Sequence, residues 1–113
     1  MLTMNDFGKL LKSLRLEKKI TQRKLAELVG IDFTYISKIE NGTMEPPAEN
    51  TIVKIAEVLG EDPDKMIIMA KKIPSYFQKI ITDNKEVPML LRKADNLSPT
   101  QWEAIHRIID TKE

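Results

Sequence analysis

TQRKLAELVGIDFTYISKIENG, residues 21–42, is the stretch that decides the fold of this chain. It contains two short segments with the periodicity of amphipathic helices, one on each side of Gly30. Apolar residues of the first segment recur at i, i+3 and i+4 and so share one helical face: Leu25, Leu28 and Val29. In the second segment, Ile36 and Ile39 face inward, with Glu40 beside them. The pattern predicts two short helices joined by a turn.

Local signals mark the ends of both predicted helices. Thr21 and Asp32 precede the two segments as N-caps, whose side-chain oxygens can accept a hydrogen bond from a free backbone N–H. Gly30 supplies the positive φ that a sharp turn between helices needs, and Gly42 closes the second helix in the same way.

The face of the second helix opposite Ile36 and Ile39 is short, polar and basic, with one exposed aromatic side chain. Its members are Phe33, Thr34, Ser37, Lys38 and Asn41. The major groove of DNA is wide enough to admit an α-helix, so such a face can contact base edges there. The second helix is therefore a candidate DNA-reading helix.

Two consecutive motifs in this stretch, T-Q-x-x-L-A-x-x-x-G and I-x-x-x-x-I-S-x-I-E-N-G, resemble the helix-turn-helix of the phage-repressor (Cro/cI-type, or Xre) family. The similarity covers roughly residues 5–72. It implies an all-α fold, with a five-helix Cro/cI-type helix-turn-helix domain that binds DNA over residues 1–72. About three short helices would follow over residues 73–113, as a C-terminal extension that serves dimerisation.

The resemblance also implies roles for individual residues. The base-reading positions of the family correspond to Phe33, Thr34, Ser37 and Lys38. Phosphate contacts are expected from Gln22, Arg23, Tyr35, Asn41 and Thr43. Arg15 is expected to form a structural ion pair with Glu40, the Glu of I-E-N-G. The following loop departs from the family, because Glu45 and Ala48 stand where Lys or Arg often contact phosphates.

Three of these roles have alternatives. Phe33 either packs on a thymine methyl group or packs partly on the first helix or on a partner subunit. Lys38 either donates to guanine or contacts a phosphate. Tyr35 either bonds a phosphate through its hydroxyl or serves packing, and the sequence does not decide between the two.

The composition is ordinary for a soluble helical protein, and the distribution of charge is more informative. The 113 residues include 42% hydrophobic and 31% charged residues, and the formal net charge is +1. Residues 7–44 hold eight Lys or Arg against four Asp or Glu, whereas residues 45–72 hold four against six. Positive charge thus gathers around the candidate DNA-binding stretch, as an electrostatic footprint should.

Several kinds of chemistry are not predicted. The chain has no cysteine and one histidine, His106, which is expected at the surface or an interface. Ordinary Cys/His zinc sites are therefore excluded, and no glycine-rich phosphate loop or catalytic triad is found. We expect no enzyme activity, cofactor or metal. No apolar run approaches the ~20 residues of a membrane span and no signal peptide is recognisable, so a cytoplasmic protein is predicted. The resemblance implies a bacterial, phage or mobile-element source.

Three further helices complete the predicted DNA-binding domain. The first covers residues 4–18, and its predicted core-facing residues are Phe7, Leu10, Leu11 and Leu14. The fourth covers residues 49–59 and turns inward Ile52, Ile55, Ala56 and Leu59. The fifth starts after Asp62 and runs to about Lys72, with core candidates Met66, Ile67 and Ala70.

The C-terminal extension keeps helical periodicity. Its last helix starts at the capping box Ser98-Pro99-Thr100-Gln101, with Pro at the first helical position. Helices this short and apolar need a surface to pack on, and we expect them to dock closely, on the N-terminal domain or on a second chain. The expected dimer contacts are Leu90, Leu91, Trp102, Ile105, Ile108 and Ile109. The alternative is a dimer through the fifth helix and its Met66–Met69 cluster.

Together these features predict a sequence-specific DNA-binding transcriptional regulator. It would be a homodimeric repressor that reads a palindromic operator through the helix at about residues 32–41. Double-stranded DNA and a second copy are the expected partners, with a regulatory protein as a further candidate. The alternative function is an antitoxin or protein-interaction switch whose C-terminal helices bind a partner protein. The low net charge favours this alternative, and the polar, basic reading face disfavours it.

Overall fold

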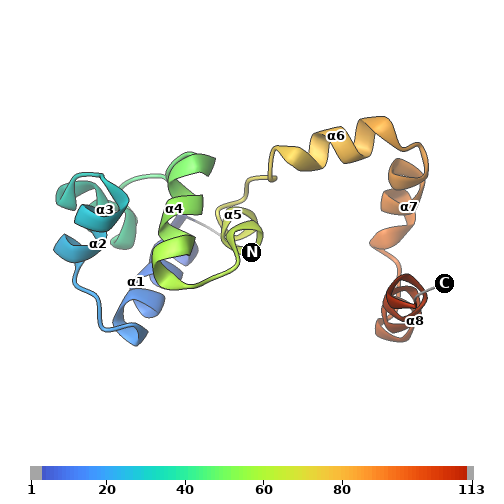
Figure 1. Cartoon of the computed structure of the whole chain (residues 1–113), viewed down its shortest axis with the longest axis horizontal. Coiled ribbons are helices and arrows are strands. Elements are labelled where there is room, and N and C mark those ends of the chain that lie inside the picture. The colour runs from blue at the N-terminus through green and yellow to red at the C-terminus, as the bar shows by residue number, and fades with distance from the viewer. Residues whose placement is uncertain (1–3, 112–113) are drawn as a thin grey trace. The chain divides into compact units, whose positions relative to one another are not determined.

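The computed structural model describes residues 4–111, with side chains from Asp6 onward, and the secondary structure of this part consists of helices joined by turns and loops (Figure 1). The N-terminal helices are α1 Met4–Glu17, α2 Gln22–Val29, α3 Phe33–Glu40, α4 Glu49–Leu59 and α5 Pro63–Met69. The C-terminal helices are α6 Tyr76–Asp83, α7 Glu86–Ala94 and α8 Pro99–Asp110. The predicted all-α fold, with five helices followed by three, is confirmed.

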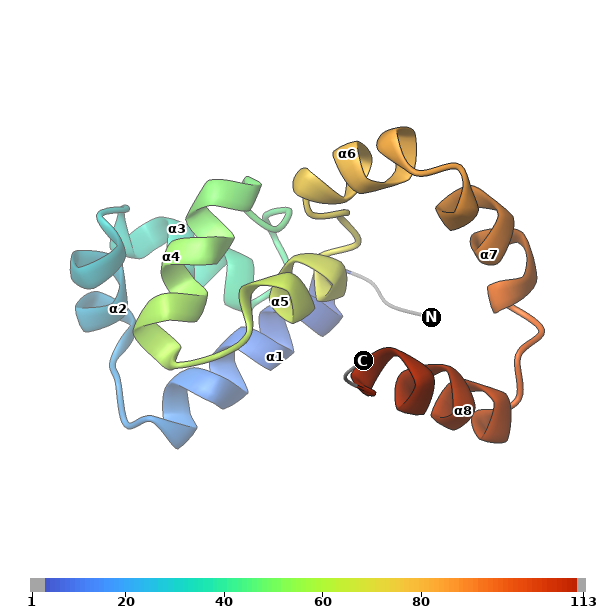
Figure 2. The same ribbon diagram turned by 45° about the vertical axis from the view of Figure 1, so that its right-hand side comes forward.

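The chain divides into two compact units, one up to Pro74 and the other from Ser75. Within the first unit, α3 packs against α1 and α2, and α4 packs against α2 and α5. In Figure 2, α2 and α3 lie next to each other and are joined by a short turn. The functional boundary predicted between residues 72 and 73 stays a prediction, as does the close docking of the C-terminal helices.

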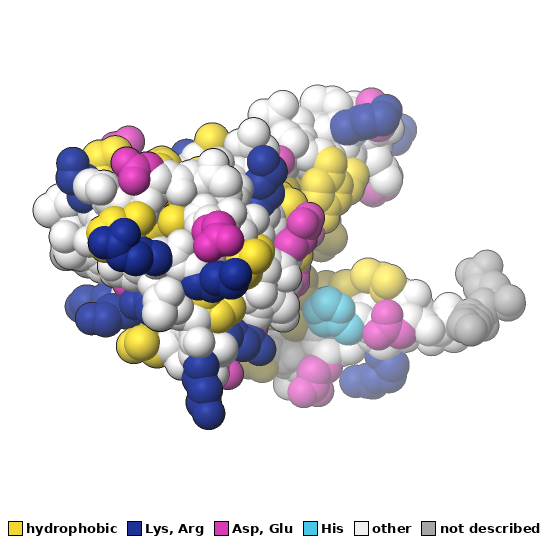
Figure 3. Space-filling view, turned by 60° about the vertical axis from the view of Figure 1, so that its left-hand side comes forward, with side chains coloured by type: hydrophobic (Ala, Val, Ile, Leu, Met, Phe, Trp, Pro, Cys, Tyr) yellow, Lys and Arg dark blue, Asp and Glu magenta, His cyan; other side chains and the backbone are white. Residues whose placement is uncertain are grey.

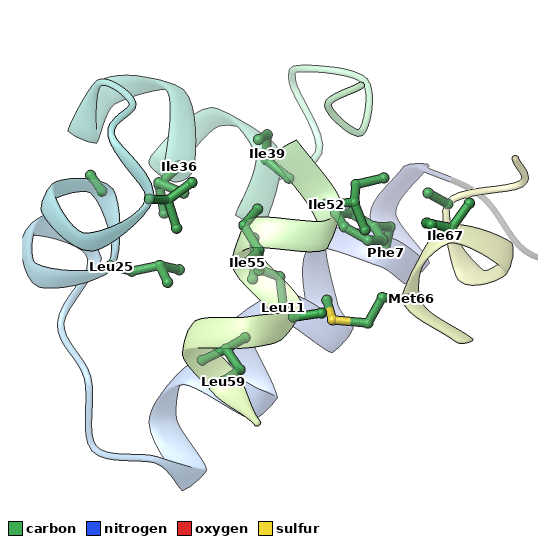
Figure 4. Packing of buried hydrophobic residues seen from close by; sticks show 14 residues of the cluster. Phe7, Leu11, Leu25, Ile36, Ile39, Ile52, Ile55, Leu59, Met66 and Ile67 are labelled. Carbon is green, nitrogen blue, oxygen red and sulfur yellow. The ribbon is translucent and has the colours of Figure 1, made fainter. Parts of the chain in front are cut away.

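A single hydrophobic core holds the first unit together (Figure 4). Its buried members are Phe7, Leu11, Leu25, Ala26, Val29, Ile36, Ile39, Ile52, Ile55, Ala56, Leu59, Met66, Ile67 and Ala70. Each fully buried Leu, Ile or Phe contributes about 1.5–3 kcal/mol relative to an exposed one, so this core supplies most of the stabilisation of the unit. The predicted inward faces of α3, α4 and α5 are confirmed.

Two core predictions are wrong or only partly right. Leu28 is 51% exposed, although its spacing placed it with Leu25 and Val29. The buried face of α2 instead includes Ala26, which shifts the centre of that face away from Leu28. In α1, Phe7 and Leu11 are buried, whereas two other predicted core residues are only partly buried, Leu10 and Leu14.

The predicted caps and turns are present in the helix-turn-helix. The Thr21 hydroxyl accepts from the Lys24 N–H at 3.0 Å, and the Asp32 carboxylate accepts from the Thr34 N–H at 3.3 Å. Gly30 and Gly42 have φ values of 84° and 82°, a left-handed conformation that other residues adopt only at a cost.

Helix α5 is shorter than predicted. It ends at Met69 rather than near Lys72, and Lys71 adopts a left-handed φ of 61°. Pro74 follows soon after and could not continue the helix, because it lacks an N–H. The apolar pattern of this segment therefore continues beyond the end of the helix at Met69.

Gly8 lies in the interior of α1, where α1 approaches the last turn of α3. A β-carbon at this position would stand 2.3 Å from the Ile39 carbonyl oxygen and 2.9 Å from that of Glu40. Only a residue without a side chain permits this approach. Gly8 therefore helps to set the position of the candidate reading helix, a role that depends on the contact between α1 and α3 and was not predicted from the sequence.

In the second unit, α6, α7 and α8 contain no buried residue. The capping box predicted at the start of α8 is confirmed, because Ser98 and Gln101 exchange hydrogen bonds of 2.9 and 3.1 Å. Within residues 4–111, no helix combines the length and the apolar character needed to cross a lipid bilayer.

Candidate nucleic-acid interface

Helix α3 presents its predicted reading face to the outside of the first unit. Ile36 and Ile39 are buried beneath it, while Thr34 and Lys38 are exposed and Ser37 is partly exposed. The aromatic side chains Phe33 and Tyr35 are partly buried against the hydrophobic core, and their roles on DNA stay predictions. The helix therefore combines a fixed inner face with short and flexible polar side chains outside.

A buried ion pair anchors the C-terminal end of this helix. Arg15 Nε and Nη2 donate to the two carboxylate oxygens of Glu40 at 2.7 and 3.0 Å. Arg15 Nη1 also donates to the Ile20 carbonyl at 2.8 Å, which fixes the chain between α1 and α2. The two residues are only 6% and 8% exposed. The bidentate hydrogen bonding therefore compensates the desolvation of both charges. The structure thus contains the pair that the family resemblance implied.

Gln22 joins the same network from the first residue of α2. Its Nε2 donates to Glu40 Oε1 at 2.9 Å, so the amide predicted to face a phosphate is partly engaged within the protein. An amide nitrogen carries two hydrogens, and one of them stays available for a second acceptor. Glu40 therefore holds Arg15 of α1 and Gln22 of α2 against the end of α3.

A small polar pocket of about 130 Å³ lies where these three helices meet. Its lining residues are Lys12, Gln22, Ser37, Glu40 and Asn41. Three of the predicted DNA contacts are thus brought together, along with Lys12 of α1. Lys12 and Arg15 are three residues apart on α1 and so share a helical face.

The loop after α3 is held by a local turn. Asn41 Oδ1 accepts from the Thr43 N–H at 3.0 Å and from the Thr43 hydroxyl at 2.7 Å. The Asn41 amide nitrogen therefore points away from this turn, and both side chains are exposed. This turn fixes the position of two predicted phosphate contacts.

Arg23 and Phe33 form a contact across the helix-turn-helix. The guanidinium carbon of Arg23 lies 4.3 Å from the centroid of the Phe33 ring, within the range of a cation–π interaction. Arg23 is the second residue of α2, and Phe33 is the first residue of α3. The contact joins a predicted phosphate contact to a predicted base-reading residue.

Figure 3 shows one face of the first unit in the foreground. Lys and Arg side chains are scattered over this face, with apolar side chains and some Asp and Glu between them. On this face the positive charge is dispersed rather than gathered in one dense patch. Within residues 4–111, no group of three or more His, Asp or Glu side chains is placed to hold a metal ion.

The family model described as "Helix-turn-helix domain" matches residues 8–73, more than half of the chain. The chain belongs to this helix-turn-helix family. The match spans α2, α3 and the helices that position them, and it confirms the predicted kinship with Xre-type regulators.

Two relatives come from Bacillus subtilis (strain 168). One, an uncharacterized HTH-type transcriptional regulator named RghRB, is 38% identical over 77 residues, which cover 68% of this chain and 55% of the relative. The other, the HTH-type transcriptional repressor RghR, is 45% identical over 56 residues, which cover 50% of this chain and 42% of the relative. The chain thus spans about half the length of the relatives that it matches.

A solved structure, "the master regulator for biofilm formation SinR in complex with DNA", is similar to the helix-turn-helix domain. The sequences are 28% identical, the TM-score is 0.51, and the match covers 54% of this chain and 97% of the SinR chain. The domain therefore shares its architecture with a protein that was crystallised on DNA.

The predicted dimer contacts lie on α7 and α8, outside the helix-turn-helix domain. Leu90, Leu91 and Trp102 are exposed, and Ile108 and Ile109 are 75% and 69% exposed. Ile105, the sixth predicted contact, is partly buried. The Trp102 ring lies near that of His106, with 6.3 Å between centroids. Their role in dimerisation stays a prediction.

Proposed function

We propose that this chain is a sequence-specific DNA-binding transcriptional regulator, a homodimeric repressor that reads a palindromic operator with α3 in the major groove. The observation that carries the proposal is the geometry of the α1, α2 and α3 junction. There, an outward polar helix face stands beside a pocket that contains donors to phosphate. The repressor RghR and the SinR–DNA complex support this proposal through their similarity to the domain.

Phosphate contacts position the domain in this proposal. The pocket beside α3 is lined by Lys12, Gln22 and Asn41, whose side chains carry N–H donors. The N-terminus of α2 lies at the same place, and its free backbone N–H groups favour an anion. Arg23, Tyr35 and Thr43 are the further phosphate candidates. These contacts fix register and orientation but carry no sequence information.

Base contacts come from the outer face of α3. The exposed ammonium group of Lys38 can donate to guanine O6 and N7, and Thr34 and Ser37 can bond base edges. Phe33 can contact a thymine methyl with the part of its ring that is not buried. One helix makes few such contacts, so two half-sites about 34 Å apart, read by a dimer, would supply the specificity.

DNA binding tests the proposal directly. Fluorescence anisotropy is measured on a duplex from upstream of the gene and on a scrambled duplex, across a salt series, for wild type and Lys38→Ala. We expect a preference for the upstream duplex that Lys38→Ala loses while weak, salt-dependent binding persists. Lys54→Ala, which removes an exposed lysine from α4, is the matched control. Equal losses on both duplexes would assign Lys38 to a phosphate.

Dimerisation through α7 and α8 rests on their exposed apolar side chains. Leu91→Glu combined with Ile109→Glu should dissociate the dimer, since both side chains are exposed and would bring charge into the interface. Leu28→Glu changes an equally exposed leucine in the first unit and serves as the control. Light scattering of the full chain gives the molar mass. A dimer that survives the double substitution would move the interface to α5.

A second function is favoured by the same helices. None of the residues in α6, α7 and α8 is buried. The apolar side chains of these helices therefore form a surface on which a regulatory protein can dock, as an antitoxin or a protein-interaction switch would require. A full-length chain that is monomeric at high concentration and selects no DNA sequence would favour this function over the first.

A further inference from the structure

We infer that Arg23 reads a guanine base rather than a phosphate, and that Phe33 is the platform that holds the Arg23 guanidinium for this contact. The inference rests on the proposed DNA-binding function and deepens it, because it adds a specificity-determining residue from outside α3. It also revises the two separate roles that the sequence suggested for these residues.

The first observation is the stacking contact itself. The Arg23 guanidinium carbon lies 4.3 Å from the Phe33 ring centroid, and Phe33 is fixed because it packs partly against the core. An arginine side chain loses conformational freedom when it binds, and a planar group already stacked on a ring has lost part of it beforehand. The contact therefore orients the guanidinium before DNA arrives.

The second observation is that the donors of Arg23 are free. Among residues 4–111, its guanidinium makes no hydrogen bond and no ion pair, and the side chain is exposed. The neighbouring Lys24 differs, because its ammonium group lies 3.8 Å from a carboxylate oxygen of Glu27. A guanidinium that is held by its face and free at its edge presents a fork of N–H donors to the solvent.

The position of the platform selects the base over the phosphate. Phe33 is the first residue of α3, and the N-terminal residues of a recognition helix are those that contact base edges. A guanidinium held over this ring stands at the entry of the reading helix into the groove. Its fork geometry matches guanine O6 and N7, which two parallel hydrogen bonds can join. Arg23 thus extends the reading surface of α3 by one residue from α2.

Selection from a pool of duplexes with a randomised centre tests this inference with the full-length protein. The variants are Arg23→Ala, Arg23→Lys, Phe33→Leu and the double variant Arg23→Ala with Phe33→Leu. Lys24→Ala is the matched control, since it removes one charge from the adjacent position of α2. Anisotropy on the selected duplex and on its single base-pair variants then gives affinities, and thermal melts verify that each variant is folded.

Wild type should select a guanine in each half-site, and replacing this guanine should weaken binding about 5- to 150-fold. Arg23→Ala should lose this preference. Arg23→Lys should weaken it, because lysine lacks the planar fork of donors, and should keep most of the salt-dependent binding. Phe33→Leu should weaken binding about two- to fivefold in the presence of Arg23 and have a smaller effect in the Arg23→Ala background. Lys24→Ala should leave the guanine preference intact.

Three results overturn the inference. In the first, Arg23→Ala weakens binding equally on every duplex, as the loss of a phosphate contact would. In the second, the effects of Arg23→Ala and Phe33→Leu add, which leaves no coupling between the two side chains. In the third, wild type selects no sequence from the pool, and the proposed function then fails as well. Arg23→Lys keeps the test decisive if Phe33→Leu does not fold.

Discussion

Replacing Glu40 by alanine should destabilise the first unit strongly, because the carboxylate of this residue compensates a buried charge. Glu40 accepts hydrogen bonds of 2.7 and 3.0 Å from Arg15 and one of 2.9 Å from Gln22. Glu40→Ala removes all three and leaves the Arg15 guanidinium without a counter-charge. Removing one partner of a buried ion pair lowers the free energy of unfolding by about 3–5 kcal/mol.

The structure favours the lower part of this range. Arg15 keeps its hydrogen bond of 2.8 Å to the Ile20 carbonyl, so one of its donors stays satisfied. A loss of about 3 kcal/mol is a large part of the 5–15 kcal/mol that stabilises an ordinary domain. For a unit of this size it lowers the melting temperature by about 12–24 °C.

Circular dichroism during thermal and urea unfolding is the suitable assay, because it follows helix content, to which all five helices of the first unit contribute. The fluorescence of Trp102, the one tryptophan of the chain, reports instead on the second unit. Glu57→Ala removes an exposed carboxylate from α4 and should change stability by less than about 0.5 kcal/mol. The double variant Arg15→Met with Glu40→Leu should be more stable than Glu40→Ala, since no charge is then left unpaired. A melting temperature of Glu40→Ala within about 2 °C of wild type would refute this reasoning.

Three further predictions concern packing and capping. Gly8→Ala should lower the free energy of unfolding by about 1–3 kcal/mol, since its β-carbon would stand 2.3 Å from the Ile39 carbonyl oxygen. This clash outweighs the helix-propensity gain of about 1 kcal/mol that alanine brings. Urea unfolding measures the change in stability, and a stabilised variant would contradict the prediction. Leu28→Ala should cost less than about 0.5 kcal/mol, whereas Leu25→Ala should cost about 2–5 kcal/mol, and similar urea midpoints for the two would show that the buried face of α2 is misassigned. Thr21→Ala should cost about 1 kcal/mol, because it removes the side-chain oxygen that accepts from the Lys24 N–H; an unchanged midpoint would mean that water replaces this cap.

The sequence predicted the helix-turn-helix well because its signals are local. Thr21, Asp32 and Gly30 act within one turn of their own position, so their types alone determine the caps and the turn. The apolar residues of α4 lie on one clear face, and each of the four predicted to turn inward is buried. Predictions of this kind need no knowledge of the neighbouring helices.

The features that the sequence did not predict depend on contacts between helices. Gly8 matters only because α1 approaches the end of α3. Leu28 fits the apolar spacing of α2, but the neighbouring helices contact a face that is rotated toward Ala26. Periodicity identifies an apolar face to within about one residue, and tertiary packing selects the residues that are buried.

Glu40 is the last residue of α3, and its carboxylate joins Arg15 of α1 to Gln22 of α2. The orientation of α3 is therefore set by a buried network on its inner side and by the close approach at Gly8. The outer residues Thr34 and Lys38 have no part in this network, so they are free to vary without loss of the fold. Changes on the outer face should alter which sequence is bound at nearly constant stability, whereas changes in the network should lower stability and weaken binding to every sequence alike. The two groups of residues separate recognition from architecture within a single eight-residue helix.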